Sequence, residues 1–243
     1  LNLTKIDLVK LSQKAENEFV GVKCGIMDQF ISVFGKKDSV LKLDCRDLSY
    51  EYFPFNFNDV KIVLFDTQVK HSLASSAYNT RREQCESGVK ILQKYDNNIL
   101  SLRDVSLSMI EKYESEFDDE IYKRCNYVIK ENLRLLNACQ DLKNNDLVSF
   151  GKMMFESHEG LKNEYQVSCQ ELDLLVDLVK DDSSVMGSRM MGGGFGGCTI
   201  NLIKEEFIDQ VSANVRKEYK KRTGIDLKVY VDKIQDGTSE IGE

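Results

Sequence analysis

The spacing of hydrophobic residues along the 243-residue chain changes several times, and the strands are the clearest part of the pattern. Apolar and polar residues alternate over 39–47 and again over 49–55, which predicts a two-stranded antiparallel unit. Three further runs are short, mostly apolar and rich in β-branched residues, which is typical of buried strands. We expect these three to share one sheet. They lie at 61–69, 198–204 and 227–234.

Helical spacing dominates the middle of the chain. Between residues 72 and about 180, apolar residues recur three and four positions apart, which predicts a block of amphipathic helices. A more polar helix is expected at about 205–222. Near the start, Thr4 and Asp7 resemble a capping box that begins a helix at once. Strands on both sides of a helical block predict an α+β fold, with an antiparallel sheet and a helical block.

One position is the best candidate for a domain boundary. Pro54 is the only proline in the chain, and the polar sequence NFND follows soon after it at 56–59. Proline and polar clusters mark the ends of regular elements. We therefore expect two units, residues 1–57 and residues 58–243.

Composition narrows the choice of partners and compartment. The net charge is -7, and no block of lysine or arginine occurs, which argues against nucleic acid and membrane surfaces as partners. No apolar run approaches the ~18 residues of a membrane span. The seven cysteines form no CxxC pair, so we expect reduced thiols in a cytoplasmic protein. They stand at positions 24, 45, 85, 125, 139, 169 and 198.

Five glycines fall within six positions at 192–197, in the sequence GGGFGG. Glycine loses more backbone entropy on folding than any other residue, so such a run needs a reason. Positive φ angles at several positions, or close approach of the backbone to a ligand, would each provide one. The formal GxGxxG match is not a dinucleotide fingerprint, because that motif opens a helix and this run precedes a strand. A flexible linker is the alternative.

A single aspartate, Asp28, interrupts the apolar sequence CGIMDQF at 24–30. If this carboxylate is buried, it must be paired or hydrogen-bonded, and its pKa can shift, as in many catalytic groups. The structural alternative is that Asp28 is simply a helix N-cap.

The stretch HSLASSAY at 71–78 is followed by Arg81 and Arg82. Two serines near a histidine could indicate a nucleophile, but there is no GxSxG elbow and no third catalytic partner. We expect a serine-rich helix start, with both arginines solvated or in salt bridges. The only histidines, His71 and His158, are far apart and not near paired cysteines, so no metal site is expected.

These three stretches, in this order, resemble the galactokinases of the GHMP small-molecule kinase family. GVKCGIMDQF is similar to the segment that holds their catalytic aspartate. HSLASSAYNTRREQCE is similar to the segment with a sugar-contacting tyrosine, although this chain has Ala77 where glutamate is usual. SRMMGGGFGGCTINLI resembles their glycine loop near the bound substrates, and KVYVDKIQDGTSEIGE resembles their terminus.

The resemblance implies a role for each matching residue. Asp28 would be the general base for the anomeric hydroxyl of D-galactose, and Tyr78 a hydrogen-bond partner of the sugar. Cys24 and Gly25 would contact the sugar through the backbone. The loop expected to lie beside sugar and phosphate comprises Gly192, Gly193, Gly194, Gly196 and Gly197.

The resemblance also implies that part of the site lies outside this chain. The family's Gly-Glu-His-x-Asp-Tyr-like sugar motif and its serine-rich phosphate loop do not occur in the sequence. Residues 1–57 would then be the tail of an N-terminal domain, and 58–243 the C-terminal domain. ATP and Mg²⁺ are the implied cofactors, with their main ligands in the missing N-terminal domain. We expect the chain alone to be inactive and to self-associate through an apolar docking face.

Three alternatives stay open at this level. One is a related kinase for another sugar, such as N-acetylgalactosamine or arabinose. Another is a non-catalytic galactose sensor of the same fold, which the phosphate loop would distinguish from a kinase. The last is an α+β interaction domain without a site, against which the glycine loop argues.

Overall fold

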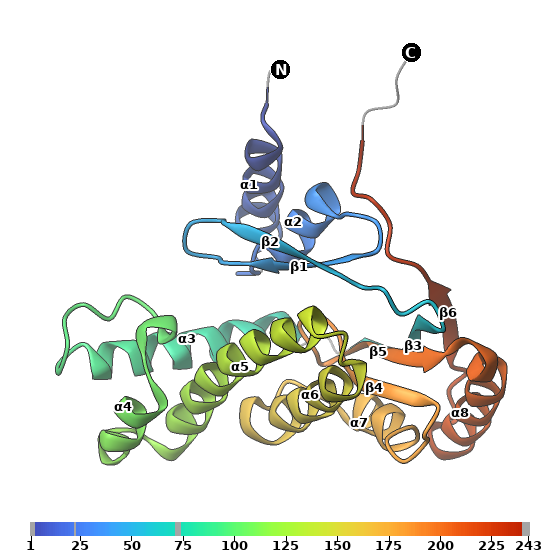
Figure 1. Cartoon of the computed structure of the whole chain (residues 1–243). Helices are drawn as coiled ribbons and strands as arrows, with labels where there is room; N and C mark the ends of the chain where they lie inside the picture. Colours follow the sequence, from blue (N-terminus) through green and yellow to red (C-terminus); the bar gives the residue numbers. More distant parts are fainter. Residues whose placement is uncertain (1–2, 22, 71–73, 240–243) are drawn as a thin grey trace.

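The computed structural model describes residues 3–21, 23–70 and 74–239. Figure 1 shows a small N-terminal unit above a larger body that contains the main sheet and most helices. The first part of the histidine–serine stretch, His71 to Leu73, lies outside the described residues.

The N-terminal unit combines two helices with a strand pair. Its elements are α1 (Lys5–Ala15), the π-helical turn η1 (Glu16–Val20), α2 (Met27–Phe34), β1 (Ser39–Leu43) and β2 (Tyr50–Pro54). The predicted capping box is confirmed, because the Thr4 hydroxyl accepts from the Asp7 N–H while the Asp7 carboxylate accepts from the Thr4 N–H. The antiparallel pairing of β1 with β2 is confirmed as well. A separate hydrophobic cluster of Val9, Ile26, Phe30 and Val33 forms the core of this unit.

The main sheet has four strands in the order β4-β5-β3-β6, and every neighbouring pair is antiparallel. The strands are β3 (Val60–Lys70), β4 (Val185–Met190), β5 (Gly196–Lys204) and β6 (Lys228–Asp232). The three strands predicted from the sequence therefore share one sheet, as expected. Strand β4 was not predicted, since its sequence VMGSRM has no clear alternation of apolar and polar residues.

Helices fill the space between β3 and β4 in the sequence, which confirms the predicted helical block. They are α3 (Ala74–Leu92), α4 (Leu107–Lys112), α5 (Asp119–Lys143), α6 (Leu147–Gly160) and α7 (Gln170–Asp177), and α8 (Ile208–Thr223) follows β5. Short turns of helix occur at η2 (Leu102–Asp104), η3 (Glu114–Glu116), η4 (Leu161–Tyr165) and η5 (Glu205–Phe207). None of the helices in the described ranges has the length and hydropathy that a membrane span requires.

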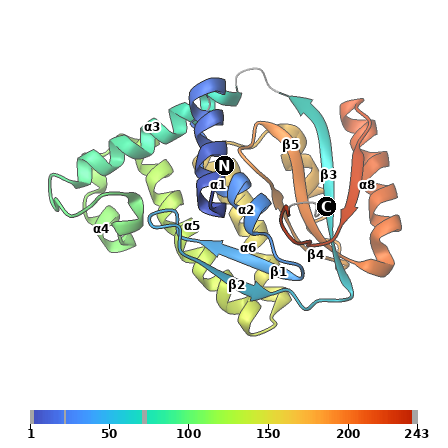
Figure 2. The same cartoon turned by 90° about the horizontal axis from the view of Figure 1, so that it is seen from above.

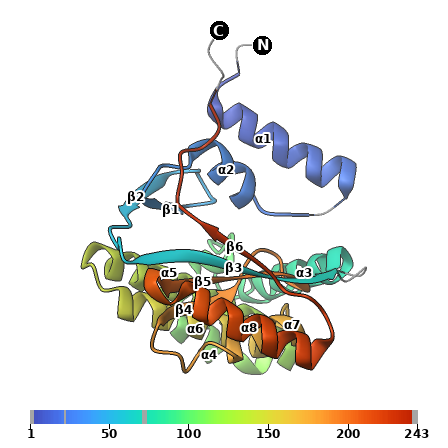
Figure 3. The same cartoon turned by 90° about the vertical axis from the view of Figure 1, so that its right-hand side faces the viewer.

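The helices cover one face of the sheet, and the N-terminal unit lies on the other side (Figure 1, Figure 3). Helix α8 buries Val211, Val215 and Tyr219, spaced four apart, against Val63 and Phe65 of the central strand β3. Such burial removes apolar surface from water and is the main stabilising contribution to the fold. The cluster is separate from the hydrophobic core of the N-terminal unit.

Replacing Gly151 of α6 by alanine should destabilise the protein, because a Cβ there would lie 1.8 Å from the carbonyl oxygen of Met186. Either α6 or β4 would have to move, and overpacking of this kind costs about 1–3 kcal/mol. The matched control is Gly25→Ala, since a Cβ at Gly25 meets nothing within 4 Å. Urea unfolding should give a lower midpoint for Gly151→Ala only. Equal midpoints for the two variants would contradict this close packing.

Candidate functional site

The glycine run forms the connection between β4 and β5. Gly192, Gly194, Gly196 and Gly197 have φ angles of 76°, 84°, 129° and 82°, and Phe195 between them has a φ of 58°. Residues with a Cβ adopt such angles only at a cost, so glycine is favoured at these positions. The prediction of positive φ angles at several positions is confirmed.

Backbone contacts fix this loop to the body of the protein. The Phe195 N–H donates to the Val167 carbonyl oxygen at 2.7 Å. A Cβ at Gly194 would come within 2.0 Å of the same oxygen, so the protein's own backbone requires glycine there. Just before the loop, the Met190 N–H donates to Nδ1 of the buried His158 at 3.2 Å. The alternative of a flexible linker is therefore wrong.

Tyr78 lies in α3 with its ring beside the glycine loop. A Cβ added to Gly193 would stand 3.6 Å from Cδ2 of Tyr78, which is an ordinary van der Waals distance. Tyr78 is half-buried, whereas Gly192 and Gly193 are exposed. The two elements together form a surface of bare backbone beside a phenol that can donate and accept hydrogen bonds.

Asp28 lies in the first turn of α2, and its side chain is exposed. Its carboxylate makes no hydrogen bond or ion pair with any residue that the structure describes. The alternative that Asp28 is a helix N-cap is wrong, because the N-cap is Ile26, which provides no side-chain hydrogen bond. The helix macrodipole favours a negative charge in the first turn. Asp28 is thus an available anionic acceptor.

The segment that leads to Asp28 is held by helix α3 through Lys23. The Lys23 N–H donates to Oδ1 of Asn79 at 3.3 Å, and the Lys23 carbonyl accepts from Arg82 at 3.1 Å. Its ammonium also forms an ion pair with Glu83 at 3.3 Å. Sequence reasoning did not find this connection, because single polar bonds between distant segments leave no periodic pattern.

Cys24 and Gly25 follow Lys23 directly in the sequence. The Cys24 thiol donates to Oδ1 of Asn17 at 3.2 Å. Burial raises the pKa of this thiol, and the nearby Glu16 carboxylate raises it further, so the protonated form is favoured. Gly25 is exposed, with open space where a side chain would be. Its backbone is therefore accessible to a ligand.

A chain of contacts brings the three sequence-predicted stretches together. Lys23, close to Asp28 in the sequence, bonds to Asn79, and the neighbouring Tyr78 packs beside Gly193. Viewed from above in Figure 2, α1 and α2 lie over the region between α3 and the start of β5. The segment that precedes Asp28 and the glycine loop are therefore both held next to the start of α3.

Arg81 and Arg82, which follow the histidine–serine stretch, both have partners within the protein. Arg81 donates to the carbonyl oxygens of Tyr165 and Gln166, and Arg82 pairs with Glu86 besides holding Lys23. The expected salt bridge is confirmed for Arg82, whereas Arg81 forms no ion pair within the described residues and instead donates to backbone carbonyls and to Gln84. Within the described residues, no group of three or more His, Cys, Asp or Glu side chains could hold a metal ion. All seven cysteines are free thiols.

Comparison with known proteins gives consistent matches along the whole chain. The family model for the GHMP kinases C terminal matches residues 138–221, and that for the GHMP kinases N terminal domain matches residues 1–36. A galactokinase of Clostridium acetobutylicum is 42% identical over 242 residues, which cover 99% of this chain and 62% of that protein. A galactokinase of Thermotoga maritima is 42% identical over 240 residues, covering 99% and 66%. The chain thus spans 62% to 66% of the length of these relatives.

Comparison with solved structures also gives a match to a galactokinase. The crystal structure of Lactococcus lactis galactokinase complexed with galactose matches with a TM-score of 0.94 and 33% identity, over 99% of this chain and 62% of that one. The L. major mevalonate kinase in complex with R-mevalonate matches with a TM-score of 0.58 over 98% of this chain and 60% of that one. At 14% identity, the second match shows a shared fold only.

Gly193 and Gly194 should respond differently to alanine. Gly194→Ala combines a φ of 84° with a backbone clash, so we expect a stability loss of about 1–3 kcal/mol. Gly193→Ala should stay within about 0.5 kcal/mol of the parent, because its Cβ would make only an ordinary contact with Tyr78. Thermal unfolding of both variants tests this order. A larger loss at Gly193 would show that the loop conformation is wrong.

Proposed function

This chain belongs to the GHMP kinase family, and on that premise we propose that it is the part of a galactokinase that carries the catalytic base and one wall of the galactose site. The match with the galactose-bound L. lactis galactokinase over 99% of the chain carries this proposal. The contacts that bring the Asp28 segment, Tyr78 and Gly193 to one side of the molecule support it. In the intact protein, the reaction is ATP-dependent phosphorylation of D-galactose to galactose 1-phosphate.

Asp28 serves as the general base in this proposal. An ionised carboxylate only accepts hydrogen bonds, so it can orient the anomeric hydroxyl and take its proton. Since Asp28 has no partner among the described residues, its oxygens are available to the sugar. Phosphoryl transfer depends more on positioning and charge stabilisation than on covalent chemistry, and a positioned carboxylate suits that requirement.

The remaining residues bind and orient the sugar. Tyr78 is the hydrogen-bond partner of a hydroxyl, and the backbones of Cys24 and Gly25 provide further contacts. The Cys24 thiol is already bonded to Asn17, which leaves its backbone as the part that meets the sugar. The exposed backbone at Gly192 and Gly193 allows close approach of sugar and phosphate.

ATP use follows from the family, and this chain's share in it is limited. The glycine loop leads into strand β5, so it does not aim a helix N-terminus at a phosphate group. Mg²⁺ would supply charge neutralisation on the transferred phosphoryl group. The described residues contain no group of three or more His, Cys, Asp or Glu side chains that could hold a metal ion by themselves. We assign the metal and the main phosphate contacts to the part of the relatives' length that this chain does not span.

Exposed apolar side chains near the start of the chain support an assignment of the chain to two domains. We assign residues 1–57 to the N-terminal domain of the family and residues 58–243 to its C-terminal domain. In the first of these parts, Phe19 is 93% exposed and Met27 57% exposed, and Leu11 and Ile31 are exposed as well. Large exposed apolar side chains that cluster mark an interaction surface.

The cytoplasmic location stays a prediction from cysteine usage.

The 243-residue chain by itself should show no galactose-dependent release of ADP. It carries a base and one wall of the sugar site, and positioning of both reactants accounts for much of such catalysis. An ADP-release assay with galactose and magnesium ATP measures this directly, and sedimentation tests for self-association through the apolar face. Turnover on the order of 1 s⁻¹ would mean that the phosphate site lies within this chain.

In the intact kinase that contains this chain, Asp28→Asn should lower kcat by ~10²–10⁴-fold, since asparagine cannot take the proton. Asp209→Asn is the matched control, because Asp209 is also an exposed aspartate in the first turn of a helix, here α8. Assays with galactose, N-acetylgalactosamine and arabinose should show a preference for galactose. Unchanged turnover in Asp28→Asn would refute the base role, and a preference for another sugar would refute galactose as the substrate.

A further inference from the structure

The chain after β6 returns from the main sheet to the N-terminal unit. Figure 3 shows this segment rising from the end of β6 past the β1–β2 pair to the level of α2. We define residues 233–239 as the strap. It follows directly on β6, whose last residue Asp232 pairs with Ile62 of the central strand β3. One end of the strap is therefore fixed to the main sheet.

The other end of the strap bonds to the last turn of α2. The Gly237 N–H donates to the Gly35 carbonyl at 2.8 Å, and the Thr238 N–H donates to the Ser32 carbonyl at 2.7 Å. The Thr238 hydroxyl donates to the same Ser32 carbonyl at 3.1 Å. Carbonyls in the last turn of a helix have no partner within the helix. The strap thus acts as the C-terminal cap of α2.

A further bond fixes the chain just beyond the end of α2. The Lys37 N–H donates to Oδ1 of Asp236 at 2.9 Å. The strap residues Asp236, Gly237 and Thr238 therefore make bonds on both sides of the point where α2 ends.

The same helix carries Asp28 at its other end. The Ser32 hydroxyl donates to the backbone carbonyl of Asp28 at 2.7 Å, so Ser32 is bonded both to Asp28 and to Thr238. Helix α2 has only eight residues and no side-chain N-cap. Isolated helices of that length are marginal in water, so contacts from outside decide its position.

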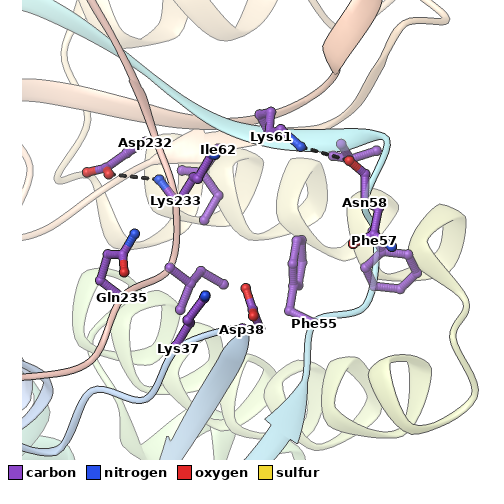
Figure 4. A pocket seen from close by; sticks show the side chains of 12 residues that line it. Lys37, Asp38, Phe55, Phe57, Asn58, Lys61, Ile62, Asp232, Lys233 and Gln235 are labelled. Atoms are coloured by element: carbon purple, nitrogen blue, oxygen red, sulfur yellow. Dashed lines mark hydrogen bonds between the residues drawn. The ribbon is translucent and has the colours of Figure 1, made fainter.

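The middle of the strap adds little packing of its own. Beside it lies a cavity of about 400 Å³, which Figure 4 shows between the strap, the start of β3 and the residues that follow α2. Lys233 and Gln235 line the cavity from the strap, with Phe55 and Lys61 among the residues across it. The strap is therefore attached at its two ends and crosses a hollow between them.

We propose that Asp236, Gly237 and Thr238 are positioning residues that set the place of Asp28 relative to the main body, an inference that rests on the proposed function. The strap holds the end of α2, while Asn79 and Arg82 hold the segment before it. The helix that presents the base is thus fixed at both ends by the larger part of the protein. Loss of the strap should leave Tyr78 and the glycine loop in place and displace Asp28.

Gly237→Ala tests the contact without changing the core. A Cβ at Gly237 would lie 2.7 Å from the Val33 carbonyl oxygen and 3.0 Å from the Gly35 nitrogen, so the strap and the end of α2 must move apart. Its φ does not lie in the left-handed region, so alanine adds no backbone strain. In hydrogen–deuterium exchange of the 243-residue chain, the amides of α2 should exchange about tenfold faster, and those of α8 should not change.

Smaller changes keep the test valid if Gly237→Ala fails to fold. Thr238→Val removes only the hydroxyl bond, and Asp236→Ala removes the acceptor for Lys37. Asp236→Asn keeps an acceptor oxygen and should restore the exchange rate of the parent. Ser239→Ala is the matched control on the same segment, because Ser239 is exposed and makes no bond within the described residues. Unchanged exchange of α2 in all the variants would overturn the inference.

Kinetics of the intact kinase separate positioning from stability. Per folded molecule, Gly237→Ala should lower kcat by about 10–100-fold with KM for ATP unchanged, since a displacement of about 1 Å can cost that much. A purely structural role would change the folded amount and not kcat. If the parent kinase turns over galactose and Gly237→Ala has the same kcat, the positioning role is wrong. If the parent does not phosphorylate galactose, the proposed function fails, while exchange still decides whether the strap holds α2.

Discussion

Strand β3 is hydrogen-bonded on both edges, and each part of the proposed site is attached to one of its ends or edges. It follows the N-terminal unit, and α3 with Tyr78 begins after it. Strand β5, which continues the glycine loop, pairs along one edge, and β6, which leads into the strap, pairs along the other. A shift of register by one residue would turn every side chain to the opposite face. The register of β3 therefore sets the relative positions of loop, tyrosine and strap.

The regular pairing of β3 with β5 is interrupted beside the glycine loop. The register shifts between Asp66 and Lys70, and Gln68 has a φ of 57°. The buried Thr67 connects this bulge to two other elements, because its hydroxyl donates to the Gly197 carbonyl at 2.8 Å and its carbonyl accepts from Tyr219 of α8 at 2.9 Å. Bulges often lie next to sites because they redirect the chain. Here the bulge joins the loop, the sheet and the covering helix.

Sequence reasoning reached most of the fold because most elements bury one face at a regular spacing. It missed β4. A glycine interrupts this strand at position 187, where a Cβ would stand 2.7 Å from Gly151 of α6, so the close packing of strand and helix requires glycine there. For the site, local patterns singled out Asp28 and the glycine loop as candidates, and the family resemblance added Tyr78; their roles stay predictions. The contacts that hold Lys23 and the strap could not be predicted in this way. They are single polar bonds between segments far apart in the chain, and nothing periodic marks them.

The strap also affects the order in which the protein can be completed. The residues joined by its bonds lie between 199 and 206 positions apart in the sequence. A ribosome that adds about 5–20 residues per second therefore releases α2 roughly 10 to 40 seconds before the strap exists. During that interval the short helix lacks its cap, and contacts of such long range form slowly. The position of α2, and with it that of Asp28, is therefore settled only after the strap has been synthesised.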